Sequence, residues 1–320
     1  MNFLFLLHKL LVFQPFSLNG KTKIVHESIN AFILSPKQFN DKNNKIREHV
    51  IETIINDNIP TKYYDNPEWL SLRNKISQFV TQLGSTHNDN EPAEKVECIR
   101  KGGRKFNYDF VIKYHYRNKS PRLCKVEFKY GADEIEDAPQ FVSPMRPSQY
   151  LTNSYEEYYF DKYLPLLSSV SGFSIPPKYE YLKQIHTDKP ECVGLYQNLY
   201  YRGCKDSSQY TGEPKAIQFY QNAKVNAKKS IETFIEQTDI LDKKLSDYLV
   251  CSQHDKNYML YNGGKIVLQT ANPDDYTIDK VEKQPEKCRW VATSFSGKRI
   301  NILLRWKNGN GIAFPAFQIQ

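Results

Sequence analysis

The segment KFNYDFVIKYHYRNKSPRLCKVEFKYG, residues 105–131, decides the fold of this chain. Apolar and polar residues alternate along 105–116 and again along 122–130, and this period of two is typical of β-strands with one buried face. Residues 117–121 between them have the composition of a turn. The segment therefore predicts a β-hairpin with an apolar face formed by Tyr108, Phe110, Ile112, Tyr114, Val126, Phe128 and Tyr130.

The opposite face of this hairpin carries the charged side chains. Folding the segment about residue 119 places Asp109 opposite Lys129 and Glu127 opposite Val111. The two carboxylates are then diagonal neighbours on one face, about 5–8 Å apart. A pairing shifted by two residues would keep them on that face, because the side-chain period is two. Two carboxylates at this separation can share one divalent cation.

This face has the groups needed to hydrolyse a phosphodiester. Mg²⁺ prefers oxygen ligands, often one or two carboxylates together with water and a substrate phosphate. It polarises the phosphoryl oxygen and lowers the pKa of bound water. A lysine two residues after a ligand carboxylate points the same way, where it can hold or deprotonate the attacking water or stabilise developing negative charge. Lys129 has this relation to Glu127.

Asp109 and the Glu127-Phe128-Lys129 triplet resemble the motif of the PD-(D/E)xK nuclease superfamily, also called restriction-endonuclease-like. The resemblance covers residues 45–130, and it departs from the motif at Tyr108, which stands where the family often has Pro. It implies an α/β (α+β) fold with a mixed central sheet flanked by helices, and a DNA hydrolase that uses Mg²⁺ or Mn²⁺. Asp109 and Glu127 would be metal ligands and Lys129 the catalytic lysine.

Further site residues follow less directly. Family members often add a carboxylate from a preceding helix, for which Glu52 is the first candidate and Glu68 the second; either could equally be a solvated helical residue. Gln140 could lie near the metal or be a plain loop residue. A hairpin with ordinary cross-strand salt bridges is the alternative to a catalytic site. A DNA-binding or interaction protein that does not cut is the alternative function, although acids facing phosphate without a metal would repel DNA.

Periodicity predicts the remaining organisation. Helices are expected at 43–56, from the Asn66 N-cap to Gly84, from Ser154, and over 214–247, and a β-rich texture follows from 248. These features divide the chain into an N-terminal extension (1–40), a nuclease core with helical insertions (41–247) and a β-rich C-terminal region (248–320). Candidate DNA contacts are Lys224 and Lys228, or else a solvated helix face, and Arg305, Lys307 and Asn308, or else a plain turn.

Composition sets the broad class. The 320 residues carry a formal charge of +8, which suits a polyanion binder but also many other basic proteins. The six cysteines show no CxxC spacing, which argues against structural zinc. Three disulfides in a secreted domain are the alternative, but the wide, irregular spacing favours reduced thiols and an intracellular (cytoplasmic or nuclear) protein. The apolar run 3–13 is too short to cross a bilayer. DNA is the expected partner, no membrane is expected, and a homodimer is left open.

Overall fold

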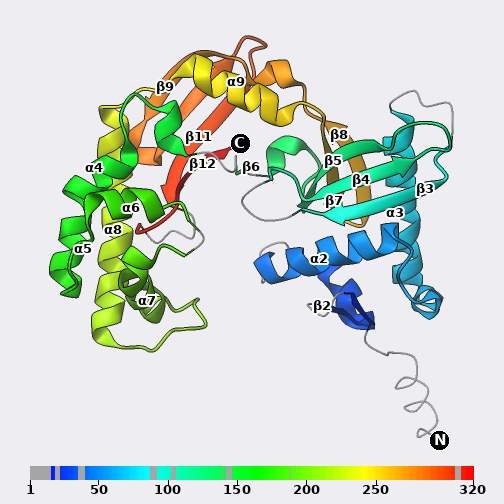
Figure 1. The fold of residues 1–320 in the computed structure, drawn as a ribbon, viewed down its shortest axis with the longest axis horizontal. Coiled ribbons are helices and arrows are strands. Elements are labelled where there is room, and N and C mark those ends of the chain that lie inside the picture. Colours follow the sequence, from blue (N-terminus) through cyan, green and yellow to red (C-terminus); the bar gives the residue numbers. More distant parts are fainter. Residues whose placement is uncertain are drawn as a thin grey trace, which may run out of the picture. The chain divides into compact units, whose positions relative to one another are not determined.

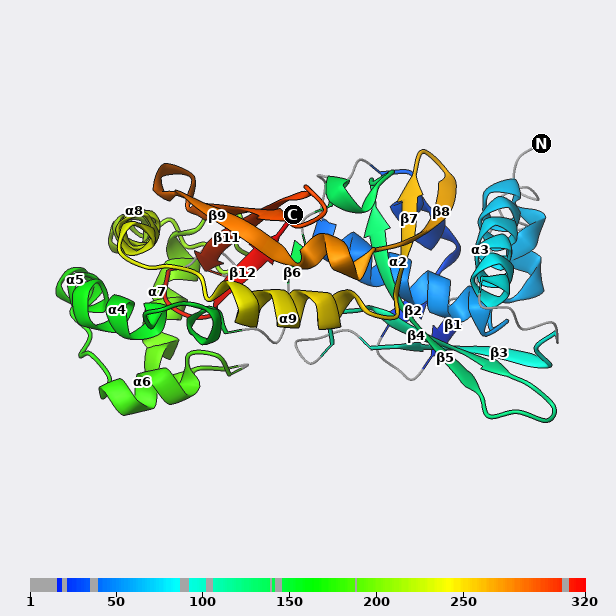
Figure 2. The same cartoon turned by 90° about the horizontal axis from the view of Figure 1, so that it is seen from above.

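The computed structural model describes residues 16–18, 22–34, 40–86, 92–101, 106–138, 140–141, 146–187, 189–306 and 311–320. The chain forms a mixed α/β structure with two compact units (Figures 1 and 2). Unit 1 contains residues 1–138 and 254–271, and unit 2 contains residues 139–253 and 272–320. Each unit is therefore built from two separate stretches of chain.

Unit 1 is organised around a mixed sheet with the strand order β3-β4-β5-β7-β8. Its antiparallel pairs are β3–β4, β4–β5 and β7–β8, whereas β5 and β7 run parallel. The strand β5 has the bounds predicted for the second strand of the hairpin, 122–130. The bounds of the strands in this sheet are β3 Lys95–Arg100, β4 Phe110–His115, β5 Arg122–Tyr130, β7 Lys256–Asn262 and β8 Lys265–Thr270.

Helices α2 (Asn40–Ile55) and α3 (Pro67–Ser85) cover one face of this sheet (Figure 1). The Asn66 side chain caps α3 by accepting hydrogen bonds from two backbone amides, as its sequence predicts. The apolar face of the hairpin packs under these helices as predicted, except for Tyr108, which lies in the bend before β4 and outside this core cluster. The smaller elements of unit 1 are β1 Phe16–Leu18, β2 Thr22–Ile24, η1 His26–Phe32, η2 Thr61–Asp65 and η3 Ile135–Asp137.

The hairpin register differs by two from the one drawn about residue 119. Phe110 pairs with Val126 and Val111 with Lys125, so Asp109 lies beside Glu127 rather than opposite Lys129. The turn is centred one residue earlier in the chain, at residue 118 instead of 119, and the side-chain parity is unchanged. β4 also begins at Phe110, later than predicted, because residues 107–109 bend before the strand.

Unit 2 combines helices with a second sheet of strand order β6-β12-β11-β10-β9, antiparallel throughout. A large aromatic cluster around Tyr155, Tyr159 and Trp306 joins the helices to β11. The elements are β6 Gln140–Phe141, η4 Pro147–Tyr150, α4 Tyr155–Lys162, α5 Leu164–Ser171, α6 Lys178–Gln184, η5 Glu191–Val193, α7 Gly194–Gly203, α8 Pro214–Glu236, α9 Asp242–Gln253, η6 Pro273–Tyr276, β9 Ile278–Gln284, η7 Pro285–Lys287, β10 Arg289–Ser294, β11 Arg299–Trp306 and β12 Pro315–Ile319.

The prediction of one helix over 214–247 is wrong. The chain leaves the helix after Glu236, and α9 begins at Asp242. Between them Ile240 forms a β-bridge with Leu151, and the amide of Asp239 donates to the Thr152 hydroxyl at 3.0 Å. These partners are distant in sequence, so the apolar period running through both helices does not reveal the break.

The unit boundaries also differ from those drawn at residues 40 and 247. Residues 254–271 belong to unit 1 because β7 pairs with β5 and its side chains enter the core under α2 and α3. A strand paired in parallel is joined to its neighbour by a long connection, here the whole first segment of unit 2. No helix in the described residues is long and apolar enough to cross a membrane.

Candidate active site

Helix α2 lies along the free edge of β3 and fixes one side of the site. Glu48 and Glu52 on α2, and Asn56 directly after its last residue, are four apart and lie on one side of it. The Asn56 amide group accepts from the Cys98 amide at 2.8 Å and donates to the Cys98 carbonyl at 2.9 Å. Glu52 Oε1 accepts from the Arg100 amide at 3.1 Å. Side chains thus pair with an edge that would otherwise present unpaired backbone groups.

Glu48, one turn before Glu52, interacts electrostatically with Asp109. Burial and the charge of Asp109 raise the pKa of Glu48 to about 7, against the opposing effects of Arg100 and Lys45. The helix that seals the sheet edge therefore also brings a carboxylate to the end of the hairpin.

Asp109 is held by the backbone of β5. Its amide donates to the Val126 carbonyl at 3.0 Å, and its Oδ2 accepts from the Phe128 amide at 2.9 Å. Burial and the neighbouring Glu127 raise the pKa of Asp109 to about 6, although the Phe128 hydrogen bond and two lysines oppose the change. The carboxylate is thus fixed in position and destabilised in its charged form.

Glu127 is 9% exposed and forms ion pairs with Lys129 and with Lys256. Burial alone would raise the pKa of Glu127, but the two ammonium groups outweigh burial and hold it below its usual value. Burial also disfavours the charged forms of Lys129 and Lys256. At Lys129 the attraction of Glu127 outweighs burial, and the pKa of this lysine is raised. At Lys256 burial outweighs the attraction of Glu127, and the pKa of this lysine is lowered.

The structure brings together Asp109, Glu127 and Lys129 from the sequence-based set. Glu52 instead contacts β3 and the Nδ1 atom of His49 at 3.3 Å. Glu68 lies in the first turn of α3, and the side chain of Gln140 is outside the described residues. Among the described residues, no group of three or more His, Cys, Asp or Glu side chains is arranged to hold a metal ion.

Sequence reasoning missed Glu48 and Lys256. The sequence did offer a way to find Glu48, because it lies four residues before Glu52 and therefore on the same face of the helix. It offered none for Lys256, because β7 aligns Lys256 with Lys125 only through parallel pairing between distant segments.

The predicted DNA contacts outside the motif lie in unit 2. Arg305 on β11 donates to Gln318 Oε1 at 2.6 Å, and burial lowers the pKa of its guanidinium group. On α8, Lys224 and Lys228 are exposed; Lys224 lies over the Tyr220 ring and Lys228 pairs with Glu232 at 3.4 Å. Lys307 and Asn308 lie outside the described residues.

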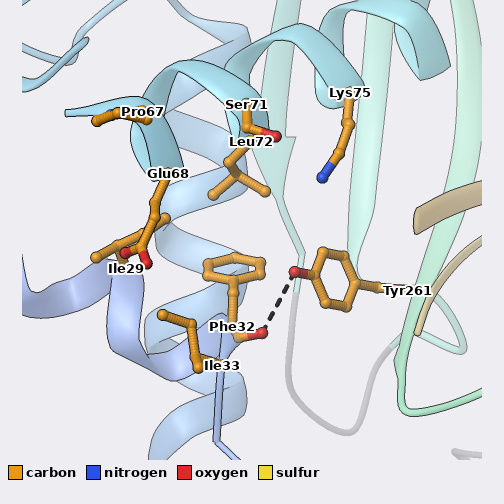
Figure 3. Close-up of a pocket in the computed structure, with 9 residues that line it drawn as sticks. All are labelled: Ile29, Phe32, Ile33, Pro67, Glu68, Ser71, Leu72, Lys75 and Tyr261. Atoms are coloured by element: carbon orange, nitrogen blue, oxygen red, sulfur yellow. Dashed lines mark hydrogen bonds between the residues drawn. The ribbon is translucent and has the colours of Figure 1, made fainter. Parts of the chain in front are cut away.

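Unit 1 also has a pocket of about 260 Å³ that does not include the motif residues (Figure 3). The pocket is lined mainly by apolar side chains, together with the charged residues Glu68 and Lys75. Two of its lining residues are joined by a hydrogen bond, which the Tyr261 hydroxyl donates to the Phe32 carbonyl at 3.3 Å. The lining residues are Ile29, Phe32, Ile33, Pro67, Glu68, Ser71, Leu72, Lys75 and Tyr261.

Comparisons with protein-family models, with curated proteins and with solved structures found no match for this chain. The candidate active site is the cluster at the open end of the hairpin, where charges from three segments interact: Glu48, Asp109, Glu127, Lys129 and Lys256.

Proposed function

We propose that this chain is a divalent-metal-dependent DNA endonuclease of the PD-(D/E)xK type. The observation that carries the proposal is the meeting of Asp109, directly before β4, with Glu127 on the neighbouring strand β5, with Lys129 on the same face as Glu127. Glu48 supports it from the preceding helix, as the helix carboxylate in place of Glu52. Clustered carboxylates with raised pKa values in one place are typical of functional sites.

The donor set suits a hard cation. Carboxylate oxygens are the protein ligands that Mg²⁺ and Mn²⁺ prefer, and Asp109 and Glu127 would supply them, with water and a substrate phosphate completing the ligand set. Burial and mutual repulsion make the charged forms of Glu48 and Asp109 costly, and a divalent cation would remove that cost. At Glu127 the cation would compete with the ammonium group of Lys256.

In the proposed reaction each residue of the site has a separate role. Bound metal would polarise a phosphoryl oxygen and lower the pKa of its water. Lys129 holds an ammonium group beside Glu127, where it stabilises negative charge on the attacking oxygen and on the phosphoryl group. Lys256 holds Glu127 in its charged form from the buried side of β7. The Phe128 amide fixes the orientation of Asp109.

A plasmid-cleavage assay tests the proposal. Purified full-length protein is incubated with plasmid and Mg²⁺ or Mn²⁺, and EDTA should abolish nicking. We expect Lys129→Ala, Asp109→Asn and Glu127→Gln each to lower the rate by about a hundredfold or more. Lys62→Ala, on η2 and outside the site, is the control. Cleavage that survives Lys129→Ala would place the active site elsewhere.

The matched pair Glu48→Gln and Glu52→Gln tests the helix carboxylate. If Glu48 acts at the site, Glu48→Gln slows cleavage without lowering thermal stability, whereas Glu52→Gln, whose amide oxygen can still accept from the Arg100 amide, leaves the cleavage rate close to that of the wild type. The reverse pattern would restore Glu52 as the helix ligand.

A DNA-binding protein that does not cut is the second candidate. The ion pairs of Glu127 with Lys129 and Lys256 favour it, because they already neutralise this acid without a metal. Metal-independent DNA binding with no cleavage under any divalent cation would support this alternative.

A further inference from the structure

An aromatic pair leads directly into the candidate site. Phe106 is 36% exposed, and its ring centroid lies 5.4 Å from that of Tyr108, with the ring planes tilted by 51°. Asp109 follows Tyr108 in sequence, so Phe106 and this acid are three positions apart. Their α-carbons are therefore at most about 10–11 Å apart.

Lys101 lies beside this aromatic pair, and its backbone is hydrogen-bonded to that of Asp109. The ammonium nitrogen of Lys101 lies 5.5 Å from the centre of the Phe106 ring. The backbone amide of Lys101 donates to the carbonyl of Asp109 at 2.7 Å. We call Phe106, Tyr108 and Lys101 the aromatic platform. The β3–β4 pairing therefore positions the platform at the acidic end of the hairpin.

Exposed aromatic rings beside a cation have a known use in nucleic-acid binding. Base–aromatic stacking binds single strands with little sequence preference, because every base has a π-face, and basic residues alongside follow the phosphate backbone. Bases within a duplex are already stacked on one another, so they reach such a ring only after being unpaired. A platform of this kind is therefore expected to bind single-stranded DNA more tightly than duplex DNA, because the base faces are accessible only in the single strand.

We propose that the aromatic platform stacks on an unpaired base next to the scissile phosphate, so that the candidate site takes single-stranded DNA in preference to blunt duplex. This inference rests on the proposed nuclease function. Phe106 is the stacking residue, Tyr108 supports its ring, and Lys101 contacts the adjacent phosphate. A phosphate held by Lys101 would lie close to Asp109, because the two residues are paired through their backbones.

Binding measured without metal tests the platform apart from the chemistry. Fluorescence anisotropy in EDTA compares full-length protein on a short single-stranded oligonucleotide and on the blunt duplex of the same sequence. We expect Phe106→Ala to weaken single-strand binding by about 5- to 150-fold and to leave duplex binding unchanged. Phe106→Trp should restore single-strand affinity, whereas Phe106→Leu should not, because it keeps the apolar surface and loses the ring face.

Phe295→Ala is the matched control, because Phe295 is a 71% exposed phenylalanine in unit 2. It should bind both DNA forms as the wild type does, and thermal melting should be the same for every variant. Equal losses on single strand and duplex, or no loss with Phe106→Ala, would overturn the platform. The two proposals fail separately. Phe106-dependent binding without any cleavage would refute only the nuclease, and Lys129-dependent cleavage indifferent to Phe106→Ala would refute only the platform.

Discussion

At the scale of single residues, Glu48 and Asp109 are carboxyl groups held partly out of water near other negative charge. Burial is the largest cause of both raised pKa values, and repulsion from a neighbouring acid adds to it. Without metal, these residues bind protons more readily in the folded protein than in the unfolded chain. The site is therefore arranged at some cost in stability, as is common where function needs charge in a confined space.

This cost predicts how stability changes with pH. A carboxyl group whose pKa is raised by folding binds more protons in the folded state, so the free energy of unfolding falls as pH rises through the folded pKa. For Glu48 that fall ends near pH 7, the value to which its pKa is raised. Glu48→Gln removes this titration. We expect Glu48→Gln to be more stable than the wild type at about pH 8 in EDTA, and to lose this advantage at about pH 5.

Urea unfolding of both proteins at the two pH values measures the difference. An unchanged gap between wild type and variant would show that Glu48 is not destabilised in its charged form. Adding Mg²⁺ at about pH 8 provides the control, because a ligand that binds only the folded state should stabilise the wild type more than the variant.

At the scale of elements, the contact between α2 and β3 links the helix to the site. Asn56 pairs with both backbone groups of Cys98, and Glu52 with the amide of Arg100. These contacts fix the position of α2 along β3. They therefore determine that the turn with Glu48 is the one that interacts electrostatically with Asp109.

We therefore expect Asn56→Ala to lower the free energy of unfolding by about 1–3 kcal/mol, because it leaves a partly buried donor and acceptor of β3 without partners. Asn74→Ala, an exposed position on α3, should change stability little or raise it slightly. Urea denaturation compares the two variants. A loss for Asn56→Ala no larger than for Asn74→Ala would show that α2 is positioned by its apolar contacts alone.

At the scale of the whole molecule, unit 1 is completed by a hairpin that follows most of the helices of unit 2. Its first strand, β7, supplies Met259 to the core of unit 1 and Lys256 to the candidate site. All residues of the sequence motif precede residue 130. The strand that pairs with β5, which carries Glu127 and Lys129, lies within residues 254–271, so the site needs this later segment to be complete.

Met259→Asp tests this dependence, because Met259 is fully buried and a charge there has no partner. We expect it to abolish cooperative folding of unit 1 and any cleavage activity, while unit 2 stays resistant to limited proteolysis. Val267→Asp is the matched control on β8, where Val267 is 41% exposed. A Met259→Asp protein with a protease-resistant unit 1 would show that the first segment folds without the β7–β8 hairpin.

Local pattern in the sequence determined the hairpin, its buried and charged faces, the start of α3 at Asn66 and the meeting of Asp109, Glu127 and Lys129 on one face. These features depend on neighbours in the chain, and side-chain alternation specifies them whatever the exact register. Only the tertiary structure decided that Glu48 interacts electrostatically with Asp109 while Glu52 contacts β3, that α8 and α9 are separate helices, and that Lys256 pairs with Glu127. Each of these outcomes is fixed by contacts between segments far apart in sequence, which no local period encodes.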